Sequence, residues 1–337
     1  MTHSKPIGVL GTGMFGTVIS GLLLKNGNRV LMWGPDRDVL DELSTEGSNT
    51  RYLPGYKLDS RPSVTMSLGE VCAECDIMFS VLPAQAVREV MAELGSFAKT
   101  HQIMVSCTKG LEYETLSRMT QVIREETPLR KVGALSGPNL AGEIAAGAPT
   151  STVIASELDE VIEEVHAVLN SNYFRVFGSH DPVGVEFCGS LKNIYAIASG
   201  AASGLGYGLN TRSFLLTKAL KEMQFFSLKF DAHRETFLGI AGAGDLIATA
   251  LSELSRNFRF GLLVAGGKTG EEALADLKGT VEGYHTVKAL YYFVRERGFR
   301  MPIAETVYNV VYKGRDTSAA VEKLLRINVL YETELYV

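Results

Sequence analysis

Apolar runs and helical patterns alternate along the first half of the chain. Residues 7–10 form a short apolar run that leads into a glycine-rich segment. Residues 14–26 carry apolar side chains at helical spacing and stop at Gly27, and a second apolar run follows at 29–33. This order predicts a strand–helix–strand unit of about thirty residues with parallel strands and a right-handed crossover.

Further apolar runs predict more strands, and helical patterns separate most of them. The runs are 77–82, 103–107, 132–135, 152–155 and 174–177, with helices expected over 84–94 and 115–125 among others. Alternating strands and helices indicate an α/β fold with a Rossmann-type, doubly wound sheet.

Strand patterns stop near residue 180, and helical patterns take over. They cover 183–199, 210–226, a segment from 245, 271–278, 286–297, 303–311 and 319–325, and the glycine cluster 200–208 is interpreted as a turn between helices. A chain of 337 residues is long enough for about two domains of roughly 150 residues each. We therefore predict a dinucleotide-binding Rossmann domain over 1–180 and an all-α substrate-binding and catalytic domain over 181–337.

Composition and charge narrow the class of protein. The chain is 46% hydrophobic, so a large core is feasible, and its net charge of −5 argues against nucleic acid as a partner. No apolar run approaches the ~20 residues of a membrane span, and residues 1–6 lead into a predicted strand without a leader pattern. The C-terminus carries no organelle address.

Four cysteines in a chain of this size fit a reducing cytoplasm. Cys72 and Cys75 form a C-x-x-C pair, but no second cluster accompanies them. We interpret them as ordinary cysteines at a helix end, and we expect no metal site.

The glycine-rich segment lies between the first predicted strand and the first helix. In this setting one glycine allows the tight turn, the next lets the backbone approach a pyrophosphate, and the third lets helix and strand pack closely. The helix start adds N–H groups that favour an anion. The context predicts dinucleotide binding by the run Gly11, Thr12, Gly13, Met14, Phe15 and Gly16. A methyltransferase loop or a plain glycine turn is the alternative.

The acidic residue expected at the end of the second strand is missing, because Trp33 is followed by Gly34 and Pro35. Asp36 can reach a ribose 2′-hydroxyl, and Arg37 can reach a 2′-phosphate. The sequence therefore leaves both NAD and NADP open as cofactors.

Lys192 lies inside a long apolar helical pattern. Burying an ammonium group costs free energy, so such a lysine is expected to have a use or a partner. Gly189 and Ala196 at helical spacing leave room for a ligand, and desolvation lowers a lysine pKa towards neutrality, which suits a general acid or base. The alternative is a structural lysine that pairs with Glu186 or extends to the surface.

Two segments offer polar groups where strands are predicted to end. Lys109 follows the strand 103–107, at the carboxyl end where α/β sheets bind ligands. It can hold a phosphate as a point charge, or it can be a solvated loop lysine. Gly137 and Asn139 follow the strand 132–135, where backbone N–H groups can line the same crevice or simply form a turn.

Two further segments offer charge and hydroxyl groups in the helical half. Asp245 is either a helix N-cap or a carboxylate that faces the lysines, and Thr249 lies one helical turn later on the same face. Ser255, Arg256 and Asn257 combine a fork-shaped cation with two hydrogen-bonding side chains, which suits a phosphate dianion unless the arginine belongs to a solvated face.

Together these segments resemble the NAD(P)-dependent glycerol-3-phosphate dehydrogenases of the bacterial type. The resemblance runs in order through nearly the whole chain. It includes GTGMFGT (11–17), SCTKGLE (106–112), LSGPNLAGEIAAGAPT (135–150), GVEFCGSLKNIYAIASG (184–200), GLGYGLNTRS (204–213), FLGIAGAGDLIAT (237–249), SRNFRFG (255–261), VEGYHTVKAL (281–290) and MPI (301–303).

The resemblance implies reversible, NAD(P)H-dependent reduction of dihydroxyacetone phosphate, a small phosphorylated three-carbon substrate, to sn-glycerol 3-phosphate. This reaction supplies the glycerophospholipid backbone. The enzyme would be cytoplasmic and usually a homodimer.

The resemblance also implies residue roles. Lys192 would be the general acid/base, Lys109 would lie between cofactor and substrate, and Asp245 and Thr249 would complete the catalytic cluster. The substrate phosphate would be gripped by Ser255, Arg256 and Asn257, with Arg256 also touching the cofactor. Gly137 and Asn139 would line the substrate, and Ala141 and Glu282 the cofactor.

Some positions depart from the family pattern. They are Phe15 for tryptophan, Gly34 for arginine, Asn139 for serine, Gly142 for lysine and Ser203 for aspartate. These departures concern cofactor preference and substrate fit more than the chemistry. The alternative functions are a related two-domain dehydrogenase of another small hydroxy acid or ketopantoate, a non-catalytic dinucleotide sensor, and a methyltransferase.

Overall fold

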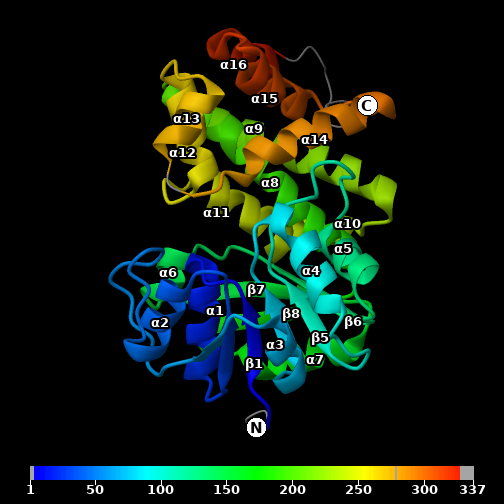
Figure 1. The fold of residues 1–337 in the computed structure, drawn as a ribbon. Helices are drawn as coiled ribbons and strands as arrows, with labels where there is room; N and C mark the ends of the chain where they lie inside the picture. Colours follow the sequence, from blue (N-terminus) through cyan, green and yellow to red (C-terminus); the bar gives the residue numbers. More distant parts are fainter. Residues whose placement is uncertain (1–3, 278, 327–337) are drawn as a thin grey trace. The chain divides into compact units, whose positions relative to one another are not determined.

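The chain divides into two compact units, which we call the sheet unit and the helical unit (Figure 1). The computed structural model describes residues 4–277 and 279–326. The sheet unit comprises the segment up to Thr108 together with Arg118–Pro182. The helical unit comprises Lys109–Ser117 together with the segment from Val183 onward. The segment Lys109–Ser117 thus belongs with the helices, which no pattern in its sequence predicts.

The sheet unit is built on an eight-stranded sheet in the order β3-β2-β1-β4-β5-β6-β7-β8. Neighbouring strands pair in parallel except β6 and β7, which are antiparallel. The strands are β1 (Ile7–Leu10), β2 (Val30–Trp33), β3 (Ser63–Thr65), β4 (Ile77–Ser80), β5 (Ile103–Ser106), β6 (Lys131–Ser136), β7 (Thr150–Ala155) and β8 (Phe174–Ser179). The predicted α/β fold with a Rossmann-type sheet is confirmed.

The central strands are buried on both faces because their side chains alternate between two cores. In β1, Ile7 and Val9 join one core, whereas Leu10 joins the other. In β4, Ile77 and Phe79 lie on the first face and Met78 on the second. This explains why the strands read as continuous apolar runs in the sequence.

Helices cover both faces of the sheet (Figure 1). They are α1 (Met14–Lys25), α2 (Arg37–Thr45), α3 (Leu68–Glu74), α4 (Val87–Gly95), α5 (Met119–Glu126), α6 (Ala141–Ala145) and α7 (Asp159–Leu169), with a single 3₁₀ turn at Ala84–Ala86. The sequence patterns missed β3, which has only three residues, one of them buried. The helix expected from residue 115 begins only at Met119, because the chain first completes the segment that packs in the helical unit.

The helical unit contains no strand within its described residues. Its helices are α8 (Pro182–Gly204), α9 (Leu209–Ser227), α10 (Arg234–Leu238), α11 (Asp245–Leu251), α12 (Arg256–Ala265), α13 (Gly270–Asp276), α14 (Glu282–Glu296), α15 (Pro302–Lys313) and α16 (Thr317–Leu325). A 3₁₀ turn (Leu228–Phe230) follows α9, and a π-helical turn (Ile240–Gly244) precedes α11. The last residue of the helix expected over 271–278 lies outside the described residues.

One prediction for the glycine cluster 200–208 is wrong, because α8 continues through Gly200 to Gly204. The reason is close packing against α12. A Cβ atom at Gly200 would collide with the carbonyl oxygen of Phe258, and one at Gly261 would collide with that of Ile197. Glycine therefore serves helix–helix contact here, and the turn begins only after Gly204.

A carboxylate fixes the start of α15 within this unit. Glu222 is 5% exposed and accepts hydrogen bonds from the backbone N–H groups of Ile303 and Ala304 at 2.9 and 3.0 Å. It thereby satisfies two of the donors that a helix start leaves without intrahelical partners.

Among the described helices, none is both long and apolar enough to cross a membrane.

Candidate active site

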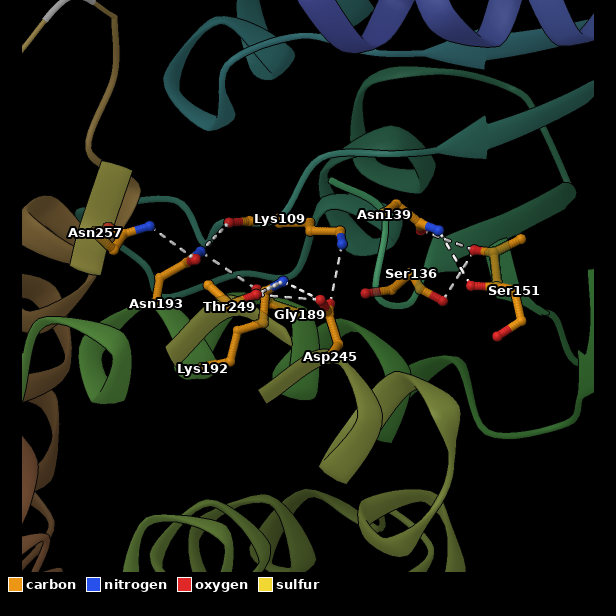
Figure 2. Close-up of polar contacts among 11 residues, drawn as sticks. Lys109, Ser136, Asn139, Ser151, Gly189, Lys192, Asn193, Asp245, Thr249 and Asn257 are labelled. Atoms are coloured by element: carbon orange, nitrogen blue, oxygen red, sulfur yellow. Dashed lines mark hydrogen bonds and ion pairs between the residues drawn. The ribbon is translucent and has the colours of Figure 1, made fainter. Parts of the chain in front are cut away.

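Lys192 lies buried in the middle of α8, 4% exposed. Its ammonium group donates to the Asp245 carboxylate and, at 2.7 Å, to the hydroxyl of Thr249 (Figure 2). Desolvation lowers the pKa of Lys192 to about 7, opposed by the charge of Asp245 and assisted by that of Lys109. Lys192 therefore does not extend to the surface, and its pKa suits proton transfer near neutral pH.

Asp245 is the first residue of α11 and is 1% exposed. Its Oδ1 atom accepts from Lys192, and its Oδ2 atom accepts from Lys109 Nζ at 2.9 Å (Figure 2). The π-helical turn before it sets this position, and a Cβ at Gly242 would collide with the backbone of Phe237. Isolated π-turns are frequent at functional sites. Of the two sequence interpretations, the structure shows the carboxylate that faces both lysines.

Lys109 begins the segment Lys109–Ser117, which we call the strap. The backbone carbonyl of Lys109 accepts a hydrogen bond from Asn193 Nδ2 at 3.1 Å. Leu111 and Leu116 are buried in the core of the helical unit, and the Tyr113 ring stacks on His285 with centroids 4.9 Å apart. Lys109 is therefore held by the same unit that carries Lys192 and Asp245.

The three residues 255–257 play different parts at the start of α12. Ser255 is the N-cap, and its hydroxyl accepts from the backbone N–H of Phe258 at 3.3 Å. Arg256 is exposed, and the Glu282 carboxylate is close enough to act on its guanidinium electrostatically. Asn257 is buried, with Nδ2 donating to Asn193 Oδ1 at 2.9 Å and Oδ1 accepting from the Gly283 N–H at 2.9 Å.

In the sheet unit, the glycine loop has the geometry of an anion cradle. Gly11 has a φ of +121°, and a Cβ at Gly16 would collide with the Gly11 carbonyl oxygen. A Cβ at Gly13 would meet nothing within 4 Å, and no side chain caps α1 at this residue. The start of α1 is thus open to a ligand, as a phosphate site at a helix N-terminus requires.

Asn49, which sequence reasoning missed, holds this loop by hydrogen bonds. It is 0% exposed, and its Nδ2 donates to the Thr12 carbonyl at 2.8 Å and to the Thr17 hydroxyl at 2.7 Å. No local pattern marks Asn49, because it lies in an irregular segment far from the loop in sequence.

The residues after β2 have local partners. The Asp36 carboxylate caps α2 by accepting from the N–H of Val39 at 3.4 Å, and it forms an ion pair with Arg51. A Cβ at Gly34 would lie 2.8 Å from Cγ2 of Thr12, so the glycine allows the end of β2 to approach the glycine loop closely.

The loop after β6 is fastened to β7. Asn139 Nδ2 donates to the Ser151 carbonyl at 3.2 Å (Figure 2). The Thr152 hydroxyl donates to Asn139 Oδ1 at 3.0 Å. A Cβ at Gly137 would lie 3.0 Å from the Thr152 Cα. Ala141 is the first residue of α6.

The predicted site residues therefore fall into two groups, one in each unit. The helical unit brings together Lys109, Lys192, Asp245 and Thr249, and it also holds Ser255, Arg256, Asn257 and Glu282. The sheet unit holds the glycine loop, Gly137, Asn139 and Ala141. Sequence reasoning missed Asn193 and Gly283, which connect members of the first group.

The cysteine pair has no reactive character. Cys72 and Cys75 are buried and free, and desolvation raises their thiol pKa values to about 11 and about 12. No cluster of three potential metal ligands occurs among residues 4–277 and 279–326.

Comparisons with known proteins identify the family of this chain. Residues 6–162 match the family model described as the NAD-dependent glycerol-3-phosphate dehydrogenase N-terminus, and residues 181–322 match the corresponding C-terminus model. The chain is 41% identical over 326 residues to the glycerol-3-phosphate dehydrogenase [NAD(P)+] of Pseudomonas fluorescens, a match that covers 97% of this chain and 95% of the relative.

Solved structures show the same likeness. The crystal structure of glycerol-3-phosphate dehydrogenase from Coxiella burnetii matches with a TM-score of 0.91 and 32% identity, covering 96% of this chain and 99% of that one. A ketopantoate reductase from Ralstonia eutropha matches with a TM-score of 0.60 at 13% identity, covering 97% of this chain and 100% of that one. This second likeness concerns the fold alone.

Proposed function

Because the chain belongs to the NAD-dependent glycerol-3-phosphate dehydrogenase family, we propose that it reversibly reduces dihydroxyacetone phosphate to sn-glycerol 3-phosphate, the backbone of glycerophospholipids. The observation that carries this proposal is the buried carboxylate of Asp245, which holds the ammonium groups of Lys109 and Lys192. Reduction of a ketone needs a proton donor and positive potential at the carbonyl oxygen, and this cluster offers both.

The glycine loop fits a dinucleotide, since Gly13 leaves open space in front of an uncapped helix start. We assign cofactor contacts to the run Gly11–Gly16, with Lys109, Ala141, Arg256 and Glu282 as further cofactor residues. The chemistry that NAD(P)H supplies when bound is hydride transfer to the C2 carbonyl of the substrate. Asp36 forms an ion pair with Arg51, and we propose NAD or NADP as the cofactor.

In the proposed mechanism Lys192 gives a proton to the C2 oxygen as negative charge develops there, and it takes the proton back in the oxidation direction. Its pKa of about 7 leaves both forms populated at neutral pH, which is the condition for an efficient general acid/base. Thr249 accepts a hydrogen bond from the same Nζ atom and so fixes the direction of the ammonium group.

Lys109 adds positive potential at the developing oxyanion, and Asp245 limits the repulsion between the two ammonium groups. For the substrate phosphate we propose Arg256 as the principal charge, with Ser255 and Asn257 completing the start of α12. Gly137 and Asn139 are also proposed to line the substrate.

The first experiment is to follow the loss of reduced-nicotinamide absorbance on adding dihydroxyacetone phosphate, with NADH and NADPH in parallel. Lys192→Ala is expected to lower kcat by about 10²–10⁴-fold while leaving cofactor affinity nearly unchanged. A near-native kcat in this variant would show that Lys192 is not the general acid/base. Cofactor binding without turnover in the wild type would instead identify a dinucleotide sensor.

The direction of the pH dependence tests the same assignment. Reduction needs protonated Lys192, so its kcat/KM is expected to fall as pH rises through about 7. Oxidation of glycerol 3-phosphate needs the neutral amine, so its kcat/KM is expected to rise over the same interval. Parallel profiles in both directions would contradict a shared acid/base.

We also propose that the enzyme is a cytoplasmic homodimer. All four cysteines are buried, and no disulfide joins any of them in the described part of the chain, which is compatible with a reducing compartment. Light scattering of the purified chain measures its mass directly, and a monomeric mass would contradict the dimer.

A further inference from the structure

Four tyrosines gather where α14 packs against α15 in the helical unit (Figure 1). The rings of Tyr291 and Tyr308 stack with centroids 3.7 Å apart, and Tyr308 stacks on Tyr312 at 5.1 Å. The hydroxyl groups of Tyr292 and Tyr308 lie 3.0 Å apart. Tyr291 and Tyr308 are 7% and 5% exposed, so packing holds their rings in place. We call these four residues the tyrosine platform.

Two cations from different helices meet at this platform. Arg295 Nη1 donates to the Tyr291 hydroxyl oxygen at 2.8 Å, and Lys313 Nζ donates to the same oxygen at 2.9 Å. Arg295 lies in the last turn of α14, and Lys313 is the last residue of α15. Lys288 adds a third positive charge, because its Nζ atom lies 5.6 Å from the centroid of the Tyr312 ring. Positive charge is therefore concentrated around the tyrosine platform.

The two converging cations have no carboxylate partner in the described part of the chain. No ion pair there joins Arg295 or Lys313 to an acidic side chain. Glu296, which follows Arg295, lies 3.9 Å from the guanidinium of Arg297 instead. The segment 282–313 carries five lysines and arginines against three glutamates, although the whole chain has a net charge of −5. The platform is thus a positive region of an acidic protein.

The two cations repel each other, since both contact one phenol oxygen. Their hydrogen bonds, that of Lys313 first, lower the pKa of Tyr291 against the opposing effect of desolvation. A helix C-terminus favours a cation, which accounts for one basic residue at each helix end but not for their convergence. An anion with two negative charges would remove the repulsion. Phosphate fits, because the guanidinium and the ammonium keep further N–H donors that suit its oxygens.

We infer that Arg295 and Lys313 form a second anion site, which binds the dianionic phosphate group of a phosphomonoester on the tyrosine platform. Both side chains are exposed, so a ligand reaches them from solvent. The Tyr291 oxygen holds them in place beforehand, which lowers the cost of ordering them on binding. Tyr292 is 53% exposed and offers a ring to the rest of the ligand. None of these residues belongs to the proposed active site, so the inference goes beyond the proposed function and does not depend on it.

Titration with inorganic phosphate tests the site at about pH 8, where phosphate is mostly a dianion. The full-length Arg256→Ala chain is used at constant ionic strength, because it lacks the proposed phosphate contact of the active site. Binding is expected with a Kd on the order of 1 mM, and adding Arg295→Gln or Lys313→Gln is expected to weaken it at least about tenfold. Arg300→Gln removes an exposed arginine between α14 and α15 and is the matched control, expected to leave Kd unchanged. Acetate, with one negative charge, is expected to bind at least about tenfold more weakly than phosphate.

A soluble phosphomonoester and a lipid headgroup present the same phosphate dianion, and sedimentation with vesicles distinguishes them. Binding to phosphatidic acid vesicles that Arg295→Gln and Lys313→Gln abolish would identify a lipid source, with singly charged phosphatidylglycerol vesicles as the control. Phosphate binding without vesicle binding would identify a soluble ligand, and either result supports the site. No phosphate binding, or equal weakening by Arg300→Gln and Arg295→Gln, would overturn it. These measurements need no turnover, so a failure to reduce dihydroxyacetone phosphate would refute the proposed function and leave this test decisive.

Discussion

Replacing Asp245 by asparagine removes the charge that both lysines share while keeping the size of the side chain. The carboxylate is 1% exposed and accepts from Lys192 and, at 2.9 Å, from Lys109. Its negative charge raises the pKa of Lys192, whereas desolvation and the charge of Lys109 lower it. Asp245→Asn therefore leaves two depressing influences unopposed.

The magnitude follows from the cost of breaking a buried ion pair, about 3–5 kcal/mol. One pKa unit corresponds to 1.36 kcal/mol, so the variant is expected to lower the pKa of Lys192 by at least about 2. With a starting pKa of about 7, half of the lysine is protonated at pH 7 in the wild type. The protonated fraction then falls to about one hundredth, which predicts an approximately 50-fold loss of reduction rate at pH 7.

The assay is the pH profile of kcat/KM for ketone reduction between pH 5 and 9. The descending limb is expected to move to lower pH in Asp245→Asn, with part of the lost rate recovered near pH 5. Thr249→Val is the control, because it removes a hydrogen-bond acceptor from Lys192 but no charge, and its limb is expected to move less. A limb that stays near 7 in a folded Asp245→Asn variant would refute the assigned coupling of Asp245 to Lys192.

Three further substitutions test the packing and the charges around the site. Gly200→Ala places a Cβ against the Phe258 carbonyl and is expected to lower the free energy of unfolding in urea by about 1–3 kcal/mol. Gly142→Ala is the control: its Cβ would meet nothing within 4 Å, and it is expected to leave this free energy unchanged or slightly higher. Glu222→Ala leaves the buried N–H groups of Ile303 and Ala304 without their acceptor, and it is expected to lower the free energy of unfolding by about 2–5 kcal/mol. The exposed Glu271→Ala is the control and is expected to lower it by less than about 0.5 kcal/mol. Equal losses in the two variants would contradict the capping role of Glu222. Arg256→Ala is expected to raise KM for dihydroxyacetone phosphate at least about tenfold and to leave KM for dihydroxyacetone unchanged. Arg259 is an exposed neighbour, and Arg259→Ala is expected to leave both KM values unchanged. An equal rise for both substrates in Arg256→Ala would show that Arg256 does not bind phosphate.

The fold could be predicted where burial leaves a recognisable pattern of apolar residues in the sequence. Strands β1 and β4 are buried on both faces, so they appear as continuous apolar runs, and the glycine loop marks the first strand–helix junction. The prediction failed where glycine has more than one physical use. The cluster after Ser199 has the composition of a turn, yet Gly200 is helical because α12 approaches α8 too closely for a side chain. Composition alone does not distinguish the two cases.

The site could be predicted where a residue type is costly at its position. A lysine inside an apolar helix needs a partner, and this reasoning selected Lys192 and offered Asp245 as a carboxylate facing the lysines. Asn193 gave no comparable signal, because a buried asparagine costs less than a buried charge and its partners lie far away in sequence. The sequence also could not predict that the strap belongs to the helical unit, because this depends on tertiary contacts of Leu111, Leu116 and Tyr113.

Close backbone approach at glycine sets the spacing of the proposed catalytic groups. Gly200 and Gly261 let α8 and α12 meet, and Gly283 lets α14 reach both Asn193 and Asn257. Since Lys192 lies on α8 and Arg256 on α12, these contacts fix the separation between proton transfer and the proposed phosphate contact. Catalysis depends on holding the carbonyl at near-attack distance, so separating these helices by even 1 Å would cost about 100-fold in rate. The glycines constrain this geometry through steric contact, and the hydrogen bonds that join Asn193, Asn257 and Gly283 constrain it through their direction. A substitution at Gly261 or Gly283 is accordingly expected to lower kcat beyond what its effect on stability explains, because the folded variant still carries displaced lysines.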